Sequence, residues 1–397
     1  MKISMVVDGL QVGGIERVAA DYAQILLSLG HEVTIINLNP NLNEMEKEFP
    51  IECKFAHIKF PRGICPEKYA LLVKRGYMMK WAYPVIYTIL KAVNCVYRIP
   101  CRLHPKLSEE FDLAIAFSSH YNDLTFVAEN FVKTKNKMCW LHGALYGYLL
   151  VSDGFINLYN KIKNLVVLVD DAQEEVLVTN KQLDLNIYKL YNPTFIKDCQ
   201  IDSKKVTELK NMYGRFMIMV SRFEFPHKDH YTVIRALKII REKYNIDISL
   251  VLIGSGPEEE KVKLFVKQQG DDLYSHTFFV GTKRDVQNYY NAADILVHAS
   301  VAGEGLPTVM LEAMAYGLPM VVTDSKVGPR EILGNNEFGL LCRVQDPEDM
   351  ARQINRLLTN NDLYQHYIER EEVRIKDFLP DTISMHLIEI LKKVVKL

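Results

Sequence analysis

Short apolar runs alternate with amphipathic stretches along the chain. In the first half, runs typical of buried strands span residues 2–7, 32–38, 112–117, 137–141, 165–169 and 187–191. Residues 15–29 form an amphipathic helix, and its apolar face carries Val18, Tyr22, Ile25, Leu26 and Leu29. This strand–helix–strand order predicts a parallel sheet covered by helices.

The second half repeats the pattern. Strands are predicted at residues 216–220, 249–253, 293–298 and 320–323, and helices at 231–241, 283–292, 307–317 and 382–396 and from 258 and 346. Between the halves, Asn192-Pro193 is a chain-breaking pair. Because 397 residues are many for one core, we predict two domains, 1–191 and 192–379.

Two carboxylates lie on the strand–loop–helix unit between residues 293 and 331. Glu304 follows a strand, and Glu312 lies eight residues later in the helix. Between them, the helix start presents free backbone N–H groups around Leu306 to Thr308, and such a helix end is an anion site. We interpret the glutamates as acceptors from sugar hydroxyls on either side of a bound diphosphate. The alternative is that both are solvated charges at a helix end.

Polar residues also follow other strands. Arg222 and Lys228 flank a turn after the strand at 216–220, where two cations can neutralise the phosphates of a leaving nucleotide. His142 follows the strand at 137–141, at the edge where open α/β sheets place ligands. Surface charges and a structural histidine are the alternatives.

Glycines follow two strands. Gly13-Gly14 follows the first strand, and Gly254-Ser255-Gly256-Pro257 follows the strand at 249–253. Glycine lets a backbone approach a ligand closely, but a tight turn explains either pair equally well. The G-x-G-x-x-G fingerprint is absent from the first turn, which disfavours a nicotinamide enzyme.

Residues 54–106 hold eleven Lys and Arg against one acid, Glu67, with tyrosines and Trp81 interleaved. Much of this segment is predicted to be helical, with a break at Pro84. A basic face with Trp and Tyr suits an anionic membrane surface or an acidic acceptor such as a lipid diphosphate. A solvated basic face is the alternative.

Composition narrows the class of protein. A net charge of -1 argues against a protein dominated by nucleic-acid binding. The seven cysteines show no C-x-x-C pair and no zinc spacing, which favours free thiols in a reducing cytoplasm. The N-terminus is not expected to be a signal peptide, and no apolar window approaches the roughly 18 residues of a membrane span.

The stretch GEGLPTVMLEAMAYGLPMVVTD, with Glu304-x7-Glu312, closely resembles the E-x7-E signature of retaining glycosyltransferases of family 4. The resemblance implies the α/β GT-B fold, in which two Rossmann-like domains face each other across a cleft and a C-terminal helix (here 380–397) packs back on the first domain. It also implies a nucleotide-diphosphosugar donor, most commonly linked to UDP, retention at the anomeric carbon, and neither metal nor cofactor.

The resemblance assigns roles residue by residue. Arg222-x5-Lys228 resembles the motif that contacts the donor diphosphate, although Asp229 replaces the glycine that often follows. CWLHG places His142 near the donor sugar. The catalytic candidates are therefore Glu304, Arg222, Lys228 and His142. The donor-binding candidates are Gly14, Arg222, Lys228, Gly254, Thr282, Lys283, Glu304, Gly305, Leu306, Pro307, Thr308 and Glu312.

The expected function is transfer of a sugar to a hydroxyl of a glycan or a polyprenyl-diphosphate-linked acceptor in bacterial surface polysaccharide biosynthesis. The expected location is the cytoplasm, with peripheral contact on the inner face of the membrane. Two alternatives remain: a catalytically inert protein that binds sugar nucleotides, and a nucleotide-sugar epimerase. A sugar phosphorylase would need a pyridoxal lysine and a much longer chain.

Overall fold

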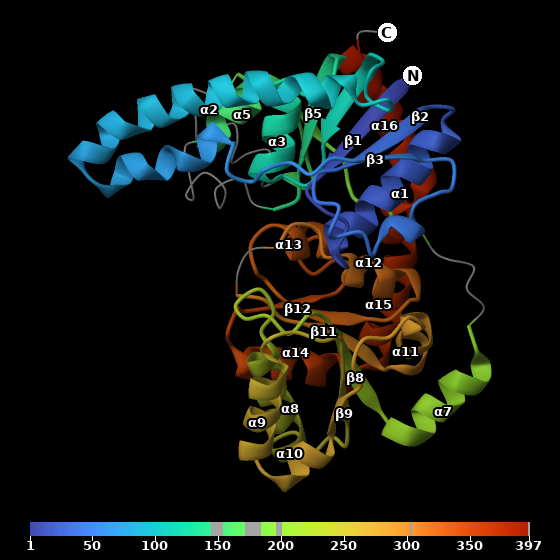
Figure 1. The fold of residues 1–397 in the computed structure, drawn as a ribbon. Helices are drawn as coiled ribbons and strands as arrows, with labels where there is room; N and C mark the ends of the chain where they lie inside the picture. Colours follow the sequence, from blue (N-terminus) through green and yellow to red (C-terminus); the bar gives the residue numbers. More distant parts are fainter. Residues whose placement is uncertain (144–153, 171–183, 196–200, 302–303, 396–397) are drawn as a thin grey trace. The chain divides into compact units, whose positions relative to one another are not determined.

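The computed structural model describes residues 1–143, 154–170, 184–195, 201–301 and 304–395. The chain forms two compact units (Figure 1). The first contains residues 1–193 together with 380–397, and the second contains residues 194–379. The boundary lies two residues beyond the predicted one, and residues 380–397 belong to the first unit.

Seven parallel strands form the sheet of the first unit, in the order β3-β2-β1-β4-β5-β6-β7. The strands are β1 (Lys2–Val7), β2 (Glu32–Asn37), β3 (Lys54–His57), β4 (Phe111–Ala116), β5 (Thr134–Leu141), β6 (Asn164–Val167) and β7 (Asn186–Lys189). The helices are α1 (Gly14–Ser28), α2 (Tyr77–Leu103), α3 (Tyr121–Ala128), α5 (Gly154–Ile162) and α16 (Pro380–Val395), with the 3-10 segments η1 (Glu46–Glu48) and η2 (Pro66–Arg75). Helices therefore separate most of the parallel strands, as predicted.

Helix α1 packs on the sheet through the predicted apolar face. Tyr22 is fully buried, and its ring meets those of Phe117 and Trp140 edge-on, with centroids 5.9 and 5.0 Å away. Its hydroxyl donates to the carbonyl oxygen of Tyr191 at 2.6 Å. A buried tyrosine needs such a partner, and this bond links α1 to the residues that follow β7.

The predicted break at Pro84 is wrong. Helix α2 runs without interruption through Pro84 and Pro100. A proline inside a helix removes one backbone hydrogen bond, at a cost of about 3 kcal/mol. The remaining bonds carry the helix past this point, and the Thr88 hydroxyl donates to the Pro84 carbonyl oxygen at 2.8 Å.

The second unit contains a six-stranded parallel sheet in the order β10-β9-β8-β11-β12-β13. The strands are β8 (Phe216–Val220), β9 (Ser249–Ile253), β10 (Thr277–Phe279), β11 (Ile295–His298), β12 (Met320–Thr323) and β13 (Leu340–Cys342). The helices are α7 (Ser203–Tyr213), α8 (His230–Glu242), α9 (Glu259–Gln268), α10 (Asp271–Ser275), α11 (Val286–Ala292), α12 (Thr308–Ala315), α13 (Gly328–Leu333), α14 (Pro347–Thr359) and α15 (Asn361–Arg374), followed by η3 (Ile375–Phe378).

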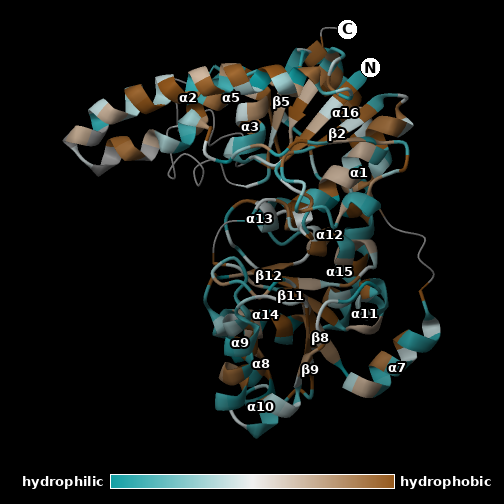
Figure 2. Cartoon of the chain, viewed as in Figure 1, coloured by the Kyte–Doolittle hydropathy of each residue, from teal (hydrophilic) through white to brown (hydrophobic). Residues whose placement is uncertain are grey.

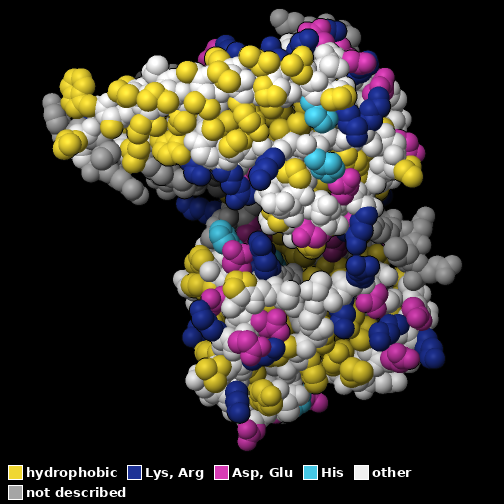
Figure 3. Space-filling model, viewed as in Figure 1, with side chains coloured by type: hydrophobic (Ala, Val, Ile, Leu, Met, Phe, Trp, Pro, Cys, Tyr) yellow, Lys and Arg dark blue, Asp and Glu magenta, His cyan; other side chains and the backbone are white. Residues whose placement is uncertain are grey.

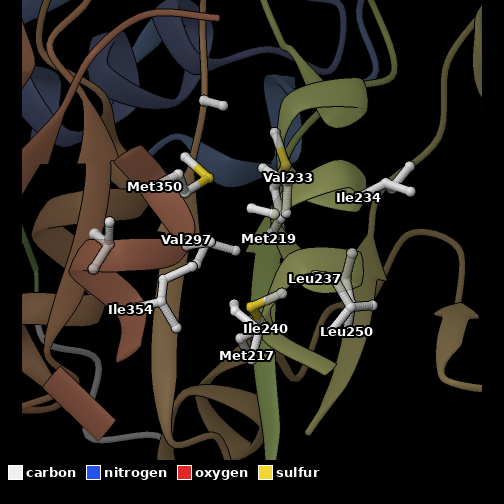
Figure 4. Close-up of a cluster of buried hydrophobic side chains, with 14 of the residues drawn as sticks. Met217, Met219, Val233, Ile234, Leu237, Ile240, Leu250, Val297, Met350 and Ile354 are labelled. Atoms are coloured by element: carbon white, nitrogen blue, oxygen red, sulfur yellow. The ribbon is translucent and has the colours of Figure 1, made fainter. Parts of the chain in front are cut away.

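The core of this unit lies between the sheet and the helices that cover it. Met217 and Met219 of β8 point toward Val233 and Leu237 of α8, while Met350 and Ile354 approach Val297 from α14 (Figure 4). All are fully buried. Because the middle strands are covered on both faces, their sequences are continuous apolar runs rather than alternating ones.

Two helices differ from the predictions. The helix expected from Lys283 begins at Val286, because Gly281 adopts a positive φ of 70° and the chain stays in a loop until Asp285. Helix α7 was not predicted, since only Leu209 and Tyr213 are buried on it. The Asp202 side chain caps α7 by accepting from the N–H groups of Lys204 and Lys205, so an N-cap was its sequence signal. Lys396, the predicted end of the last helix, lies outside the described residues.

Helix α15 buries one carboxyl group. Glu371 is fully buried, and neither of its oxygens has a hydrogen-bond partner in the described structure. Burial raises the pKa of Glu371 well above its ordinary value, so the folded protein holds it protonated. Its stability contribution is then full below the unfolded-state pKa of about 4.3 and is lost as the pH rises toward the folded-state pKa.

We expect Glu371→Gln to be more stable than the wild type by about 1–3 kcal/mol at pH 8, because the amide does not ionise on unfolding. The difference should shrink toward pH 4. Urea unfolding between pH 4 and 8 measures it. The exposed neighbour Glu372→Gln is the control and should change little. A difference that is equal at every pH would contradict the buried titration.

Candidate functional site

The carboxyl edge of the second sheet gathers Lys228, His298 and Glu304. Strands β8 and β11 are parallel neighbours, so the loops that follow them leave the same edge. Lys228 lies in the loop between β8 and α8, His298 is the last residue of β11, and Glu304 lies between β11 and α12. The backbone N–H of Asp229 donates to the Ala299 carbonyl oxygen at 2.8 Å, which joins the two loops.

Glu304 is the centre of this cluster. Its carboxylate oxygens accept from Lys228 Nζ at 2.6 and 2.7 Å, and His298 Nε2 lies 3.1 and 3.2 Å from them. The Glu304 side chain is 11% exposed, and the His298 side chain is fully buried. Sequence reasoning brought Lys228 and Glu304 to one edge of the sheet, and the structure places them in direct contact.

The protonation states follow from these contacts. Burial alone would raise the pKa of Glu304, but His298 and Lys228 hold it at about 2. Burial and the nearby Lys228 lower the pKa of His298. At neutral pH we therefore expect an ionised Glu304 and a neutral His298 that donates from Nε2. Within the described structure, the buried His298 Nδ1 has no hydrogen-bond partner.

The N-terminus of α12 lies next to Glu304 in the chain. Pro307 is its N-cap residue and Thr308 its first residue, while Leu306 is buried. The first-turn amides and the helix dipole give this end a partial positive charge. The cluster therefore combines one ammonium group, a helix end and one carboxylate, a set that suits a ligand bearing both phosphates and hydroxyls.

A segment with a strained backbone, Val327-Gly328, is hydrogen-bonded to the loop that contains Glu304. Val327 has a φ of 97°, which is rare for a β-branched residue, and it forms a parallel β-bridge with Glu304. The next residue, Gly328, donates its N–H to the Glu304 carbonyl oxygen at 3.1 Å. A Cβ on Gly328 would lie 1.5 Å from the Gly305 carbonyl oxygen, so only glycine fits. Backbone strain of this kind is concentrated at functional sites.

Arg222 pairs with a different carboxylate from the one that binds Lys228. Its side chain is 66% exposed, and its Nε lies 2.9 Å from Glu224. The fully buried Asp229, which stands where the resembling family often has glycine, caps α8 by accepting from the Thr232 N–H and hydroxyl at 3.1 and 2.6 Å. Asp229, which replaces the glycine common in the resembling family, thus helps to hold the loop that carries Lys228.

Glu312 lies on α12, two turns after Glu304. The Tyr290 hydroxyl donates to Glu312 Oε2 at 3.0 Å, and the Tyr290 ring stacks on that of Tyr316 with centroids 5.8 Å apart. This pairing fixes the orientation of the carboxylate. Sequence reasoning did not single out Tyr290 or His298. For His298 a signal was present, because it ends a strand at the carboxyl edge, as His142 does.

The glycines after β9 have partners within the protein. A Cβ on Gly254 would lie 2.0 Å from the Ser221 carbonyl oxygen, and one on Gly256 would lie 2.5 Å from that of Phe223. Gly254 also donates its N–H to the Gly281 carbonyl oxygen at 3.0 Å. Close packing of the loops after β8, β9 and β10 therefore accounts for both glycines.

Thr282 and Lys283 lie in the loop that contacts Gly254. The Thr282 hydroxyl is 3.2 Å from that of Ser255, and its side chain is exposed. Lys283 is half-buried. Three neighbouring strands of one sheet thus send their loops, and with them five of the donor-site candidates, to the same edge (Figure 1).

The remaining two candidates, Gly14 and His142, lie in the first unit. His142 follows β5, and its Nε2 lies 2.7 Å from the Phe117 carbonyl oxygen. Burial lowers the pKa of His142 to about 4, so the ring is neutral, donates from Nε2 and keeps Nδ1 as an acceptor. A Cβ on Gly14 would meet nothing within 4 Å, so the space beside this first residue of α1 is open.

A polar cluster that sequence reasoning missed lies at the same edge of the first sheet. Asp8 follows β1, and its carboxylate accepts from Asn122 Nδ2 at 2.7 Å and lies 3.3 Å from His120 Nδ1. The contact with Asp8 raises the pKa of His120. The ring of His120 is half-exposed, whereas Asp123 beside it is fully buried.

The described residues contain no group of three or more His, Cys, Asp or Glu side chains placed to hold a metal ion. The cysteines that the structure describes are free thiols, and all but Cys95 are buried.

The second unit matches the sequence model of a known family. Residues 200–374 match the sequence model of the family described as glycosyl transferases group 1. An uncharacterized glycosyltransferase of Haemophilus influenzae is 24% identical over 366 residues, which is 92% of each chain. The N-acetylgalactosamine-N,N'-diacetylbacillosaminyl-diphospho-undecaprenol 4-alpha-N-acetylgalactosaminyltransferase of Campylobacter jejuni is 26% identical over 210 residues, about half (53%) of each chain.

Solved structures extend the likeness to the whole fold. Anabaena HepE in complex with UDP and glucose has a TM-score of 0.74 at 17% identity and covers 99% of this chain and 100% of its own. A mutant of S. aureus TarM in complex with Fondaparinux, alpha-GlcNAc-glycerol and UDP has a TM-score of 0.72 at 15% identity and covers 98% and 99%. The predicted GT-B fold, with two parallel, Rossmann-like α/β sheets, is confirmed. The fold, the match of residues 200–374 and the relative that spans nearly the whole chain together support a glycosyltransferase with the GT-B fold.

Proposed function

We propose that this chain is a retaining glycosyltransferase that moves a sugar from a UDP-sugar, a nucleotide diphosphosugar, to a hydroxyl of a glycan or lipid-linked acceptor. The observation that carries the proposal is the contact of Lys228 with Glu304 beside the N-terminus of α12. UDP is also the nucleotide bound to the structural relatives HepE and TarM.

In this proposal the phosphates meet positive charge. Lys228, Arg222 and the loop that leads into α12 (Gly305 to Thr308) bind the diphosphate and stabilise the charge that it gains on leaving. Lys228 would then exchange its ion pair with Glu304 for a phosphate oxygen. Arg222 is exposed and tied only to a neighbouring side chain, so it is able to turn to the ligand at little cost.

Glu304 and Glu312 would bind hydroxyls. Once Lys228 turns to the phosphate, Glu304 accepts from a hydroxyl of the donor sugar, and its bond from His298 keeps its orientation. Glu312, oriented by Tyr290, accepts from the ribose. Gly254, Thr282 and Lys283 are the candidates for the nucleoside, and Gly14 for close approach to the phosphates. We propose that the reaction uses neither metal nor cofactor.

The proposed chemistry is a displacement on one face of the sugar. The acceptor oxygen forms a bond to the anomeric carbon on the face from which the phosphate oxygen departs, and the acceptor proton passes to that phosphate oxygen. Both electrons of the broken bond leave with the nucleoside diphosphate. Glu304 is a poor candidate for a covalent nucleophile in this proposal, because its carboxylate accepts from a hydroxyl of the donor sugar and from His298. His142, neutral with Nδ1 as an acceptor, suits the acceptor side.

We further propose an acceptor on a polyprenyl diphosphate or a growing glycan, in bacterial surface polysaccharide biosynthesis. The Campylobacter relative, by its name, acts on a diphospho-undecaprenol-linked glycan, and another relative is an amylovoran biosynthesis glycosyltransferase. Such acceptors are made at membranes, so we propose a cytoplasmic protein that works at the inner membrane face through residues 54–106.

A donor screen tests the proposed function. The protein is incubated with UDP-, GDP- and ADP-sugars, and the released nucleotide is quantified, with Glu304→Ala as the comparison. Slow release from one donor that is lost in the variant supports the proposal. If no donor is hydrolysed, calorimetric titration with UDP decides: binding without transfer to any acceptor indicates an inert binder. Conversion of the donor sugar without an acceptor, followed by NMR, would indicate an epimerase instead.

A further inference from the structure

The surface of α2 carries an apolar stripe that the fold leaves uncovered. Hydrophobic side chains lie along the length of this helix in the space-filling view (Figure 3), and the helix is largely hydrophobic in the hydropathy view (Figure 2). Its most exposed apolar residues include Trp81, Val85, Ile89, Val96, Ile99 and Leu103, which are 57–74% exposed. Six large side chains in water on one helix are unusual for a soluble surface.

The stripe is continuous along one face. At 3.6 residues per turn, these six positions fall within an arc of about 80°. From Trp81 to Leu103 the stripe extends over about 33 Å along the helix. An amphipathic helix of a globular protein normally turns such a face toward the core.

Polar side chains instead hold α2 against the first unit. Lys91 pairs with Glu129, Arg98 donates to the Glu129 carbonyl oxygen at 3.2 Å, and Arg102 donates to that of Asn130 at 2.7 Å. On the helical wheel these three positions are centred about 120° from the apolar stripe. The helix therefore docks on its own protein through cations and presents its apolar side to the surroundings. This is the reverse of the usual arrangement of an amphipathic helix.

A buried ion pair strengthens this attachment. Glu67 of η2 is fully buried, and Lys161 of α5 donates to it at 2.8 Å and to Glu129 at 2.9 Å. Helices α2 and η2 are thus anchored to α5 and to the end of α3 by charged groups. Burying charged pairs is costly, so this arrangement indicates that α2 is held in a defined position with its stripe outward.

Charge distinguishes the partners that would cover the stripe. Glu67 is the one acid between residues 54 and 106, and it is buried, whereas Lys59, Arg62, Lys68 and Lys80 are exposed. A second copy of the chain would bring the same cations face to face, which is unfavourable. A surface of anionic lipids offers both an apolar layer for the stripe and negative charge for the cations.

The helix does not fit a transmembrane role. In the part of the chain that the structure describes, no helix is both long enough and apolar enough to cross a bilayer. An apolar stripe with cations on other faces instead suits a helix that lies in the plane of the membrane interface.

We propose that α2 is an in-plane membrane anchor that inserts the stripe from Trp81 to Leu103 into the surface of an anionic bilayer. The inference deepens the proposed function, because it names the element that would bring the first unit to a lipid-linked acceptor. It rests on the exposed stripe of α2 and the cations around it, and it holds whatever sugar the protein transfers.

Trp81 provides a direct reporter. The chain has two tryptophans, and the other, Trp140, is 1% exposed in the core. Vesicles of phosphatidylcholine alone, and with about one-third phosphatidylglycerol, are added to the protein. We expect a blue shift of Trp81 emission, and quenching by brominated lipids, on the anionic vesicles only.

The stripe variant carries Trp81→Gln, Val85→Gln and Ile89→Gln, since glutamine preserves helix propensity. Its matched control carries Met212→Gln, Leu264→Gln and Met385→Gln at similarly exposed positions on other helices. In vesicle sedimentation the stripe variant should bind at least about tenfold more weakly than the wild type, and the control should bind normally. Release of nucleotide from a soluble donor should remain unchanged in both, so a failure here is distinct from a failure of the proposed function.

Three results would overturn the anchor. The first is equal binding of the wild type and the stripe variant. The second is the absence of anionic preference, with neutral vesicles bound as well. The third is a concentration-dependent dimer in light scattering that the stripe variant abolishes, which would assign this face to a second copy.

Discussion

Replacement of Lys228 by alanine is expected to lower the turnover of the proposed sugar transfer by about 10²–10³-fold. Lys228 is the cation in direct contact with Glu304, and it would neutralise the departing phosphate in the transition state. Removal of one such donor typically costs about 3–4 kcal/mol. The Michaelis constant for the donor should change much less, because the interaction strengthens only as the bond breaks. Steady-state kinetics over a range of donor concentrations measure both.

The variant Lys243→Ala is a suitable control for the loss of a positive charge. Lys243 is at the other end of α8, and its ion pair with Glu348 is more than half exposed. It should retain normal turnover. Lys228→Arg, which keeps the charge but not the shape, should recover part of the activity. Near-normal turnover of Lys228→Ala in a folded protein would remove Lys228 from the mechanism.

Gly328→Ala is expected to weaken donor binding at least about tenfold and to destabilise the second unit by about 1–3 kcal/mol. The added Cβ would lie 1.5 Å from the Gly305 carbonyl oxygen and 2.9 Å from Pro307 Cδ. Since real Cβ contacts lie beyond 3.0 Å, the loop between Glu304 and α12 must move. The amides of that loop are the ones proposed to hold the diphosphate.

Calorimetric titration with UDP and thermal unfolding measure the two effects of Gly328→Ala. Gly63→Ala is the control, because its Cβ would meet only the Tyr69 hydroxyl at an ordinary 3.7 Å. It should bind UDP and unfold as the wild type does. Normal UDP affinity in Gly328→Ala would show that the loop after Glu304 plays no part in holding the diphosphate.

The strands were predictable because buried strands have continuous apolar sequences. β1, β8, β9 and β12 begin and end at the predicted residues, since each is a short apolar run followed directly by a glycine or a polar residue. The errors lie where burial gives no signal. α7 is mostly exposed, so its polar sequence looked like a linker, and the break at Pro84 overestimated what one lost hydrogen bond does to a long helix.

The candidate site was predictable to the level of the sheet edge. Motif and strand order brought Lys228 and Glu304 together, but side-chain partners depend on tertiary packing that spacing does not encode. His298 was missed because a histidine that ends an apolar strand is usually structural, and only the structure places its ring against Glu304. The membrane or acceptor role expected for residues 54–106 stays a prediction. In the structure several cations of this segment face the protein.

The discontinuity of the first unit has a consequence for biosynthesis. Helix α16 contributes buried side chains, among them Ile383, Leu387 and Leu391, to a unit whose other residues end at Pro193. The ribosome makes the entire second unit between these two parts. The second unit therefore has its complete sequence first, whereas the first unit must wait for the final residues of this sequence before its core can close. Nascent chains that stop short of residue 380 should expose the α16 docking surface of the first unit, and chaperones would meet that surface rather than the donor-binding unit.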